Sequence, residues 1–281
     1  MQVQKLLLSF SFILLASVGF SQQLPVARNI QAAYQKGTRS ADGKPGKNYW
    51  QNGADYTLRI NFNPETRLVS GIVDINYSNN SPDTLRQVWF KLYPNLYKTG
   101  TPRESAISPR DLGEGVVIDT MWINGQLANK NVMAINGTNM TVNRQSVASG
   151  KSIQFRIAYH YTLNKTSHVR TGEVEPNAHF IAYFFPRIAV YDDIDGWNRF
   201  PYNGKQEFYN DFCDFDAYIT VPKNFVLWAT GDLQNCNEVL NQTYCQRIQQ
   251  AERSDAMINV IDTIDDRQNI TLIIASERSA C

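Results

Sequence analysis

The sequence predicts an all-β protein: an antiparallel two-sheet sandwich or saddle-like domain with long loops. Three observations support this fold class. Apolar and polar residues alternate in several short stretches, turn-forming Gly, Pro and Asn separate those stretches, and no segment shows a long helical period. Alternation places one row of side chains on a core and the other row in water, which is typical of packed antiparallel sheets.

The first regular pattern is a β-hairpin. Residues Tyr56–Phe62 alternate, and Asn63–Thr66 forms a turn in which Pro64 fixes one backbone angle. The return strand is expected at Arg67–Tyr77. Its core face carries Val69, Val73, Ile75 and Tyr77.

Further strands follow at similar intervals. They are expected at residues 88–93, 117–123, 152–162, 217–221, 225–230, 258–261 and 270–274. The pattern at 152–162 is the cleanest, and Asn124-Gly125 favours a type I′ turn. The loop from Tyr93 to Gly115 is long, and it is either a functional loop or an excursion between sheets.

Residues 1–21 have the pattern of a signal peptide. Lys5 precedes the apolar stretch Leu6–Phe20, and small residues at Ser17, Gly19 and Ser21 suit cleavage before Gln22. The alternative is an uncleaved amino-terminal anchor. No later apolar run has the length of a membrane span. We therefore expect an exported protein, periplasmic or extracellular, without a membrane span after signal removal.

The remaining chain divides into a flexible lead-in at 22–48 and one β domain at 49–281. Within the lead-in, Ala27–Tyr34 could form a short helix, but Gly and Pro follow at once and favour a loop. Near the carboxyl end, Ile270–Ala275 has the pattern of a strand in mid-fold, and only a few residues follow it. We therefore expect the chain to stop before the natural protein does.

The composition supports a packed core and excludes one class of partner. Apolar residues make up 43% and aromatic residues 12%, which is enough for a sizeable core. The formal net charge of +1 gives no electrostatic reason to expect a nucleic acid partner.

The cysteines suggest one disulfide. Cys236 and Cys245 flank a polar stretch between two expected strands, so a bridge would join two hairpin arms. The alternative is two thiols in adjacent strands. Cys213 is expected to be a small buried hydrophobic residue.

The sequence lacks the common hydrolytic machinery. It contains no H-E-x-x-H, no G-x-S-x-G and no glycine-rich phosphate loop. Its histidines are His160, His168 and His179, and none lies four residues from another. We therefore expect no catalytic residue and no metal ligand in this chain.

Two groups of acidic residues leave three interpretations open. The groups are Asp192, Asp193 and Asp195, and Asp211, Asp214 and Asp216. They could bind Ca²⁺, recognise the free α-amino group of a substrate, or cap backbone amides in turns.

One long stretch resembles a known family. Its most specific parts are Phe184–Arg187, Val190–Trp197, Gln206–Tyr209 and Asp214–Pro222. Tyr49–Asn52 and Trp89–Asn95 also match. Together these segments resemble the amino-terminal β domain of bacterial zinc aminopeptidases of peptidase family M1, and the similarity covers roughly residues 49–274.

The resemblance implies a saddle-shaped β domain that forms one wall of the active-site cleft. In the family, a thermolysin-like domain follows and holds the zinc, and the intact enzyme removes amino-terminal residues from peptides. This chain carries no cofactor of its own, so its implied partners are the missing catalytic domain and, in the intact enzyme, peptide substrates. The segment Phe185–Asp193 borders the substrate's amino end in such proteins, which makes Arg187, Tyr191 and Asp192 the candidate cleft residues.

A different class of function fits the same fold. The chain could be a secreted β-sandwich module that only binds, with carbohydrate or a protein as its ligand. Aromatic residues exposed on one face would favour this alternative.

Overall fold

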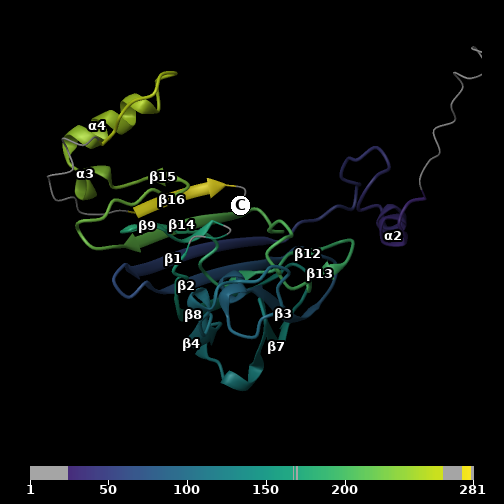
Figure 1. Ribbon diagram of the computed structural model, residues 1–281. Helices are drawn as coiled ribbons and strands as arrows, with labels where there is room; N and C mark the ends of the chain where they lie inside the picture. Colours follow the sequence, from purple (N-terminus) through teal and green to yellow (C-terminus); the bar gives the residue numbers. More distant parts are fainter. Residues whose placement is uncertain (1–24, 167, 169, 262–273, 280–281) are drawn as a thin grey trace, which may run out of the picture. The chain divides into compact units, whose positions relative to one another are not determined.

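A computed structural model describes residues 25–166, 168, 170–261 and 274–279 (Figure 1). The chain divides into two compact units, residues 1–49 and residues 50–281. The expected signal peptide at 1–21 lies outside the described residues. Among the helices that the structure describes, none is long and apolar enough to cross a membrane.

The described residues of the first unit include the helix α2 (Arg28–Lys36). The helix ends at Gly37, whose φ of 70° lies in the left-handed region that glycine adopts at low cost. The Gly37 amide donates to the carbonyl groups of Ala33 and Tyr34 and so satisfies the last turn. The short helix considered for Ala27–Tyr34 is therefore present, and turns occupy the Gly- and Pro-containing residues that follow it.

The second unit is built on two larger sheets. The eight-stranded sheet has the order β15-β16-β14-β1-β2-β8-β4-β5. Its strands are β1 (Gly53–Asn63), β2 (Leu68–Asn79), β4 (Val117–Ile123), β5 (Gln126–Leu127), β8 (Lys151–Thr162), β14 (Cys213–Thr220), β15 (Asp232–Leu233) and β16 (Ile274–Ser279). The four-stranded sheet has the order β11-β3-β7-β6. Its strands are β3 (Leu85–Lys91), β6 (Met133–Asn136), β7 (Asn139–Val147) and β11 (Arg187–Ile188).

Among its described residues, this unit also has two small hairpins and three 3₁₀ helices. The hairpins are β9 (Thr171–Glu175) with β10 (Ala178–Ile181), and β12 (Tyr191–Asp192) with β13 (Gly196–Trp197). The 3₁₀ helices are η1 (Tyr93–Tyr97), η2 (Pro109–Asp111) and η3 (Lys130–Val132). The long loop between Tyr93 and Gly115 therefore has local structure, and every residue of η1 is buried.

The alternating sequence patterns define the face on which the core forms. Phe62 pairs with Val69, which in turn pairs with Tyr161, so strands β1, β2 and β8 direct one continuous row of apolar side chains to the same side. The four-stranded sheet packs on this row, as the 5.2 Å contact between the rings of Phe90 and Phe155 shows. The all-β, two-sheet prediction is confirmed. Most strand pairs are antiparallel, but β1 and β14 pair in parallel.

Several expected strands are absent or lie elsewhere. Residues 225–230 and 258–261 form no strand. Helices α3 (Cys236–Val239) and α4 (Gln242–Ala251) occupy the region that the sequence suggested was a hairpin. Asn241 explains part of this difference, because its side chain caps α4 by accepting from the Tyr244 amide at 3.0 Å. Of the expected strand at 270–274, only Ile274 falls within the described residues, where it begins β16.

Candidate functional site

The inner face of the large sheet is fully covered at one side and half open at the other. On β8 the inward residues Ile153, Phe155 and Ile157 are all buried. On β14 the equivalent residues Phe215, Ala217 and Ile219 are only half-buried, although they belong to the same apolar row. The four-stranded sheet therefore covers the β8 side of this face more completely than the β14 side.

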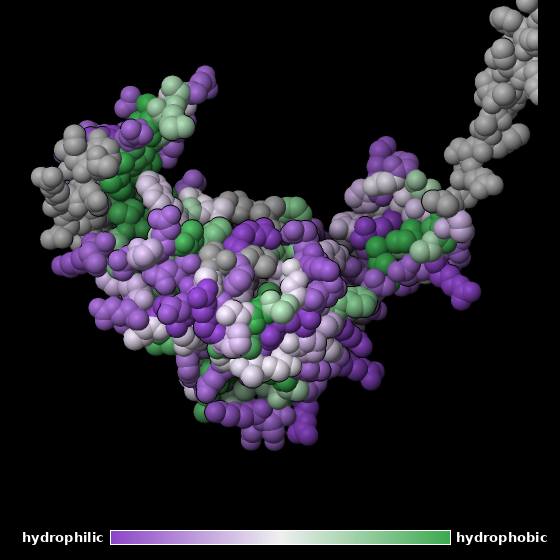
Figure 2. All heavy atoms as spheres, viewed as in Figure 1, coloured by the Kyte–Doolittle hydropathy of each residue, from purple (hydrophilic) through white to green (hydrophobic). Residues whose placement is uncertain are grey.

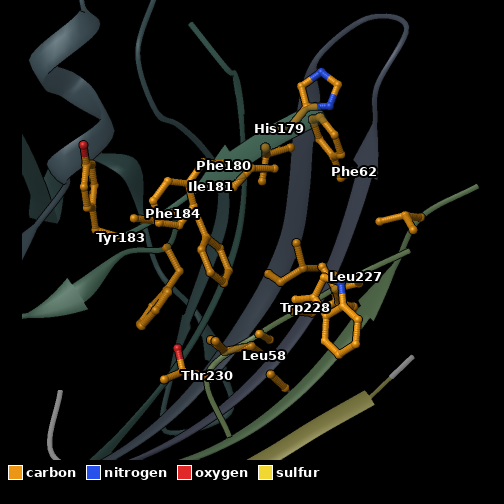
Figure 3. A pocket seen from close by; sticks show the side chains of 18 of the residues that line it. Leu58, Phe62, His179, Phe180, Ile181, Tyr183, Phe184, Leu227, Trp228 and Thr230 are labelled. Atoms are coloured by element: carbon orange, nitrogen blue, oxygen red, sulfur yellow. The ribbon is translucent and has the colours of Figure 1, made fainter. Parts of the chain in front are cut away.

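A groove with a volume of about 1120 Å³ lies over this half-open part. Its floor consists of inward side chains of β1 and β14. One wall is β10 with residues 182–185, and the other is the irregular segment 224–230 (Figure 3). In Figure 3, Phe180 and Ile181 lie on one side of the groove, and Leu227 and Trp228 lie across from them. Most of the described side chains that line the groove are apolar or aromatic, and none of these is a carboxylate.

Arg187 lies at one end of this groove and is buried. Its Nη2 donates to the backbone oxygen of Asp211 at 2.9 Å and lies 2.9 Å from Sγ of Cys213. Its guanidinium carbon also lies 5.5 Å from the centre of the Phe215 ring and 5.9 Å from the Tyr56 ring. Arg187 therefore joins β11 to the start of β14, and its hydrogen bonds serve the fold.

His179 lies on β10 at the other end, next to Phe62 (Figure 3). The two rings meet edge to face at 4.9 Å. Nδ1 of His179 is buried and has no hydrogen-bond partner among the described residues. Burial lowers the pKa of His179; the nearby Glu173 opposes this shift, and Arg67 adds to it. The residue therefore lies in a strand and faces an aromatic ring.

Tyr191 and Asp192 do not line the groove. The Tyr191 hydroxyl donates to Asp83 at 2.7 Å, and its ring stacks on Trp50 at 5.7 Å. Oδ1 of Asp192 accepts from the amides of Ile194 and Asp195, which is turn capping. Its Oδ2 accepts from the Tyr209 hydroxyl at 2.8 Å.

The other acidic residues and histidines do not come together as a metal site. Asp193 is buried, whereas Asp214 and Asp216 are exposed on the outer face of β14. His160 pairs with Asp119 at 3.0 Å, and His168 with Asp111 at 3.2 Å. In the part of the chain that the structure describes, no group of three or more His, Cys, Asp or Glu residues could hold a metal ion.

The structure joins Cys236 to Cys245 by a disulfide, with their Cα atoms 5.8 Å apart. The bridge connects α3 to α4, so its setting differs from the expected hairpin arms. Cys213 is buried beside Arg187.

Sequence reasoning missed the walls of the groove. Phe180 and Trp228 are 50% and 63% exposed, which is high for large apolar side chains. The available signal was the aromatic-rich stretch at 180–185, whose residues show no strict alternation.

Comparisons with known proteins give similarities at the level of structure only. No family model matches the sequence, and no curated protein matches it. The structure resembles an M1 zinc metallopeptidase from Deinococcus radiodurans at 13% identity and a TM-score of 0.40, covering 83% of this chain and 41% of that one. It resembles native leukotriene A4 hydrolase from Saccharomyces cerevisiae at 12% identity and a TM-score of 0.41, covering 91% and 31% of the two chains.

A third similar structure is aminopeptidase A from Legionella pneumophila, in complex with aspartic acid. It has 10% identity and a TM-score of 0.38, with 66% of this chain and 18% of that one covered. The chain thus spans less than half the length of each of these three proteins. The Deinococcus protein belongs to the family that the sequence resembles.

Proposed function

We propose that this chain is the amino-terminal β domain of an exported zinc metallopeptidase of the aminopeptidase type. In this proposal the domain is not catalytic by itself. It forms one wall of the substrate cleft, and a catalytic domain that holds the zinc packs against it. The sequence resemblance at Phe184–Arg187, Val190–Trp197 and Asp214–Pro222 supports the lineage.

The half-open inner face of β14 is the observation that carries the proposal. The inward apolar side chains of the large sheet continue from the closed core into the open groove. Such a surface has the composition of one that another element covers. The exposed rims Phe180 and Trp228 extend this apolar surface outward on both sides. A face of this kind on an isolated domain is costly in water, and packing a second domain on it removes that cost.

The roles of the three candidate cleft residues differ in this proposal. Arg187 is a positioning residue, because it is buried and its guanidinium bonds to the backbone oxygen of Asp211 and to Sγ of Cys213. Tyr191 and Asp192 form part of the cleft wall, and the exposed Tyr209 holds one oxygen of Asp192. The chemistry of peptide hydrolysis would belong to the domain that holds the zinc.

The gene sequence downstream of the Cys281 codon tests the lineage. An in-frame continuation that encodes H-E-x-x-H supports the proposal, and a stop codon in the natural gene contradicts it. The chain alone should not hydrolyse aminoacyl substrates with added zinc, whereas the chain with its continuation should. Chelator-sensitive turnover by the chain alone would contradict the assignment and require catalytic residues within it.

The cleft-wall role has a separate test in the continued protein. There, Asp192→Asn should raise KM for peptides several-fold with little change in kcat. The matched control is Asp214→Asn, since Asp214 is exposed on the outer face of β14. Equal KM values for the two variants would favour a role for Asp192 in the turn alone. Export is tested by the intact mass, which should show the loss of about the first 21 residues.

A further inference from the structure

The segment between β14 and β16 carries a small core of its own. Val239, Leu240, Tyr244 and Cys245 are buried together, and Leu227, Leu233, Cys236, Ile248, Val260 and Ile261 pack around them. Figure 2 shows hydrophobic residues gathered along α4. This cluster is separate from the main core between the two large sheets.

Helices of this size need outside support. The α3 helix has 4 residues and α4 has 10, and isolated helices this short are marginal in water. The Cys236–Cys245 disulfide joins the first residue of α3 to the buried face of α4. It reduces the conformational freedom of this segment in the unfolded state, which is how a disulfide stabilises a small core.

Leu227 connects this cluster to the groove. It packs against the cluster and also lines the groove, beside Trp228 (Figure 3). Residues 225–229 belong to no helix or strand, so no ladder of backbone hydrogen bonds fixes them. Their position depends on side-chain packing, with the sheet on one side and the cluster on the other.

We propose that the Cys236–Cys245 disulfide is a redox-dependent clamp on the groove wall formed by residues 224–230. A dithiol reductant would transfer two electrons and two protons to the bridge, giving two cysteine thiols and the oxidised reductant. The α3–α4 cluster then loses its covalent cross-link. Leu227 no longer packs against a fixed surface, and the wall formed by residues 224–230 opens. This inference concerns the wall itself and holds whatever the groove binds.

Chymotrypsin cleavage after Phe225, Leu227 and Trp228 measures the opening, because a folded chain is cut only where it unfolds locally. Mass mapping compares these cuts with cuts after Phe155 and Tyr159 in β8 on the full chain, oxidised and reduced. Reduction should speed cleavage of the wall at least tenfold and leave β8 unchanged. Cys236→Ala/Cys245→Ala should reproduce the reduced rates under oxidising conditions. The control Cys213→Ala should still respond to reductant as the unaltered chain does.

Two further outcomes would overturn the clamp. Faster cleavage within α4 without any change at the wall would show that the bridge acts on the helices alone. Faster cleavage in β8 as well would show that the disulfide stabilises the whole fold and not the groove wall alone. Leu227→Ala provides a check with the bridge intact, since it should also speed wall cleavage. Unchanged wall cleavage in that variant would contradict the role of Leu227 as the connection.

Discussion

The guanidinium of Arg187 donates a 2.9 Å hydrogen bond to the backbone oxygen of Asp211, on the chain just before β14. The Asp211 side chain is half-buried there. Burial raises the pKa of the Asp211 carboxyl to about 6, and the charge of Asp192 adds to the rise. A hydrogen bond from Gln51 and the charge of Arg187 oppose it.

This pKa predicts a pH dependence of stability. A carboxyl whose pKa is raised on folding stabilises the protein at low pH, and that contribution is lost as pH rises through about 6. The free energy of unfolding should therefore fall between pH 4 and pH 7 by on the order of 2 kcal/mol more in the unaltered chain than in Asp211→Asn. Urea titrations of both proteins across this range measure the difference. Parallel pH profiles would show that Asp211 titrates normally.

Lys91 predicts that the free energy of unfolding changes with the opposite sign at alkaline pH, so that stability rises with pH. Its side chain is buried in β3, and Nζ donates to Asn139 at 2.9 Å, to Asn198 at 3.2 Å and to the Phe200 carbonyl at 2.7 Å. Burial lowers the pKa of Lys91 to about 8. Because the folded protein releases this proton more easily than the unfolded chain, stability should rise as pH passes from 7 to 9, by about 1 kcal/mol.

The matched variant for this prediction is Lys91→Met, which keeps the aliphatic stem and removes the titrating group. Its overall stability should be lower, because three acceptors lose their donor. The informative quantity is the slope of unfolding free energy against pH. If the unfolding free energy of both proteins has the same slope against pH between pH 7 and 9, the pKa of Lys91 is not lowered.

Gly172 should be irreplaceable at the start of the β9–β10 hairpin. Its φ is 123°, and a Cβ atom there would lie 2.4 Å from the Thr166 carbonyl oxygen. Gly172→Ala should therefore cost about 2–4 kcal/mol of unfolding free energy. The control is Gly113→Ala, where a Cβ meets nothing within 4 Å. Similar stabilities for the two variants would mean that the hairpin adapts to a side chain.

The sequence predicted those strands that have one buried face and one solvent-exposed face. Strands β1, β2 and β8 alternate between more and less buried residues along most of their length, because each lies within the large sheet. Residues 225–230 misled the prediction because Leu227 packs on the α3–α4 cluster while Trp228 is exposed, so an alternating pattern arises without a partner strand. The α3–α4 region has a polar sequence, and its Asn241 cap was the missed signal.

The candidate site was less accessible to sequence reasoning. Arg187, Tyr191 and Asp192 are close in sequence, yet Arg187 is buried at the groove end and Asp192 caps a turn outside it. The groove itself brings β1 together with residues more than a hundred positions later. Such long-range proximity depends on the parallel pairing of β1 with β14, which no local pattern specifies.

The central claim is that the groove is a surface left for another domain to cover, and sedimentation velocity tests it most directly. The chain should self-associate as concentration rises, and Phe180→Ser/Trp228→Ser should stay monomeric and bind less hydrophobic dye. The control is Leu127→Ser/Tyr218→Ser, which removes two other exposed apolar side chains, 67% and 43% exposed, outside the groove. It should associate like the unaltered chain. A strictly monomeric unaltered chain at high concentration, with no dye bound, would contradict the claim and favour a free-standing binding module.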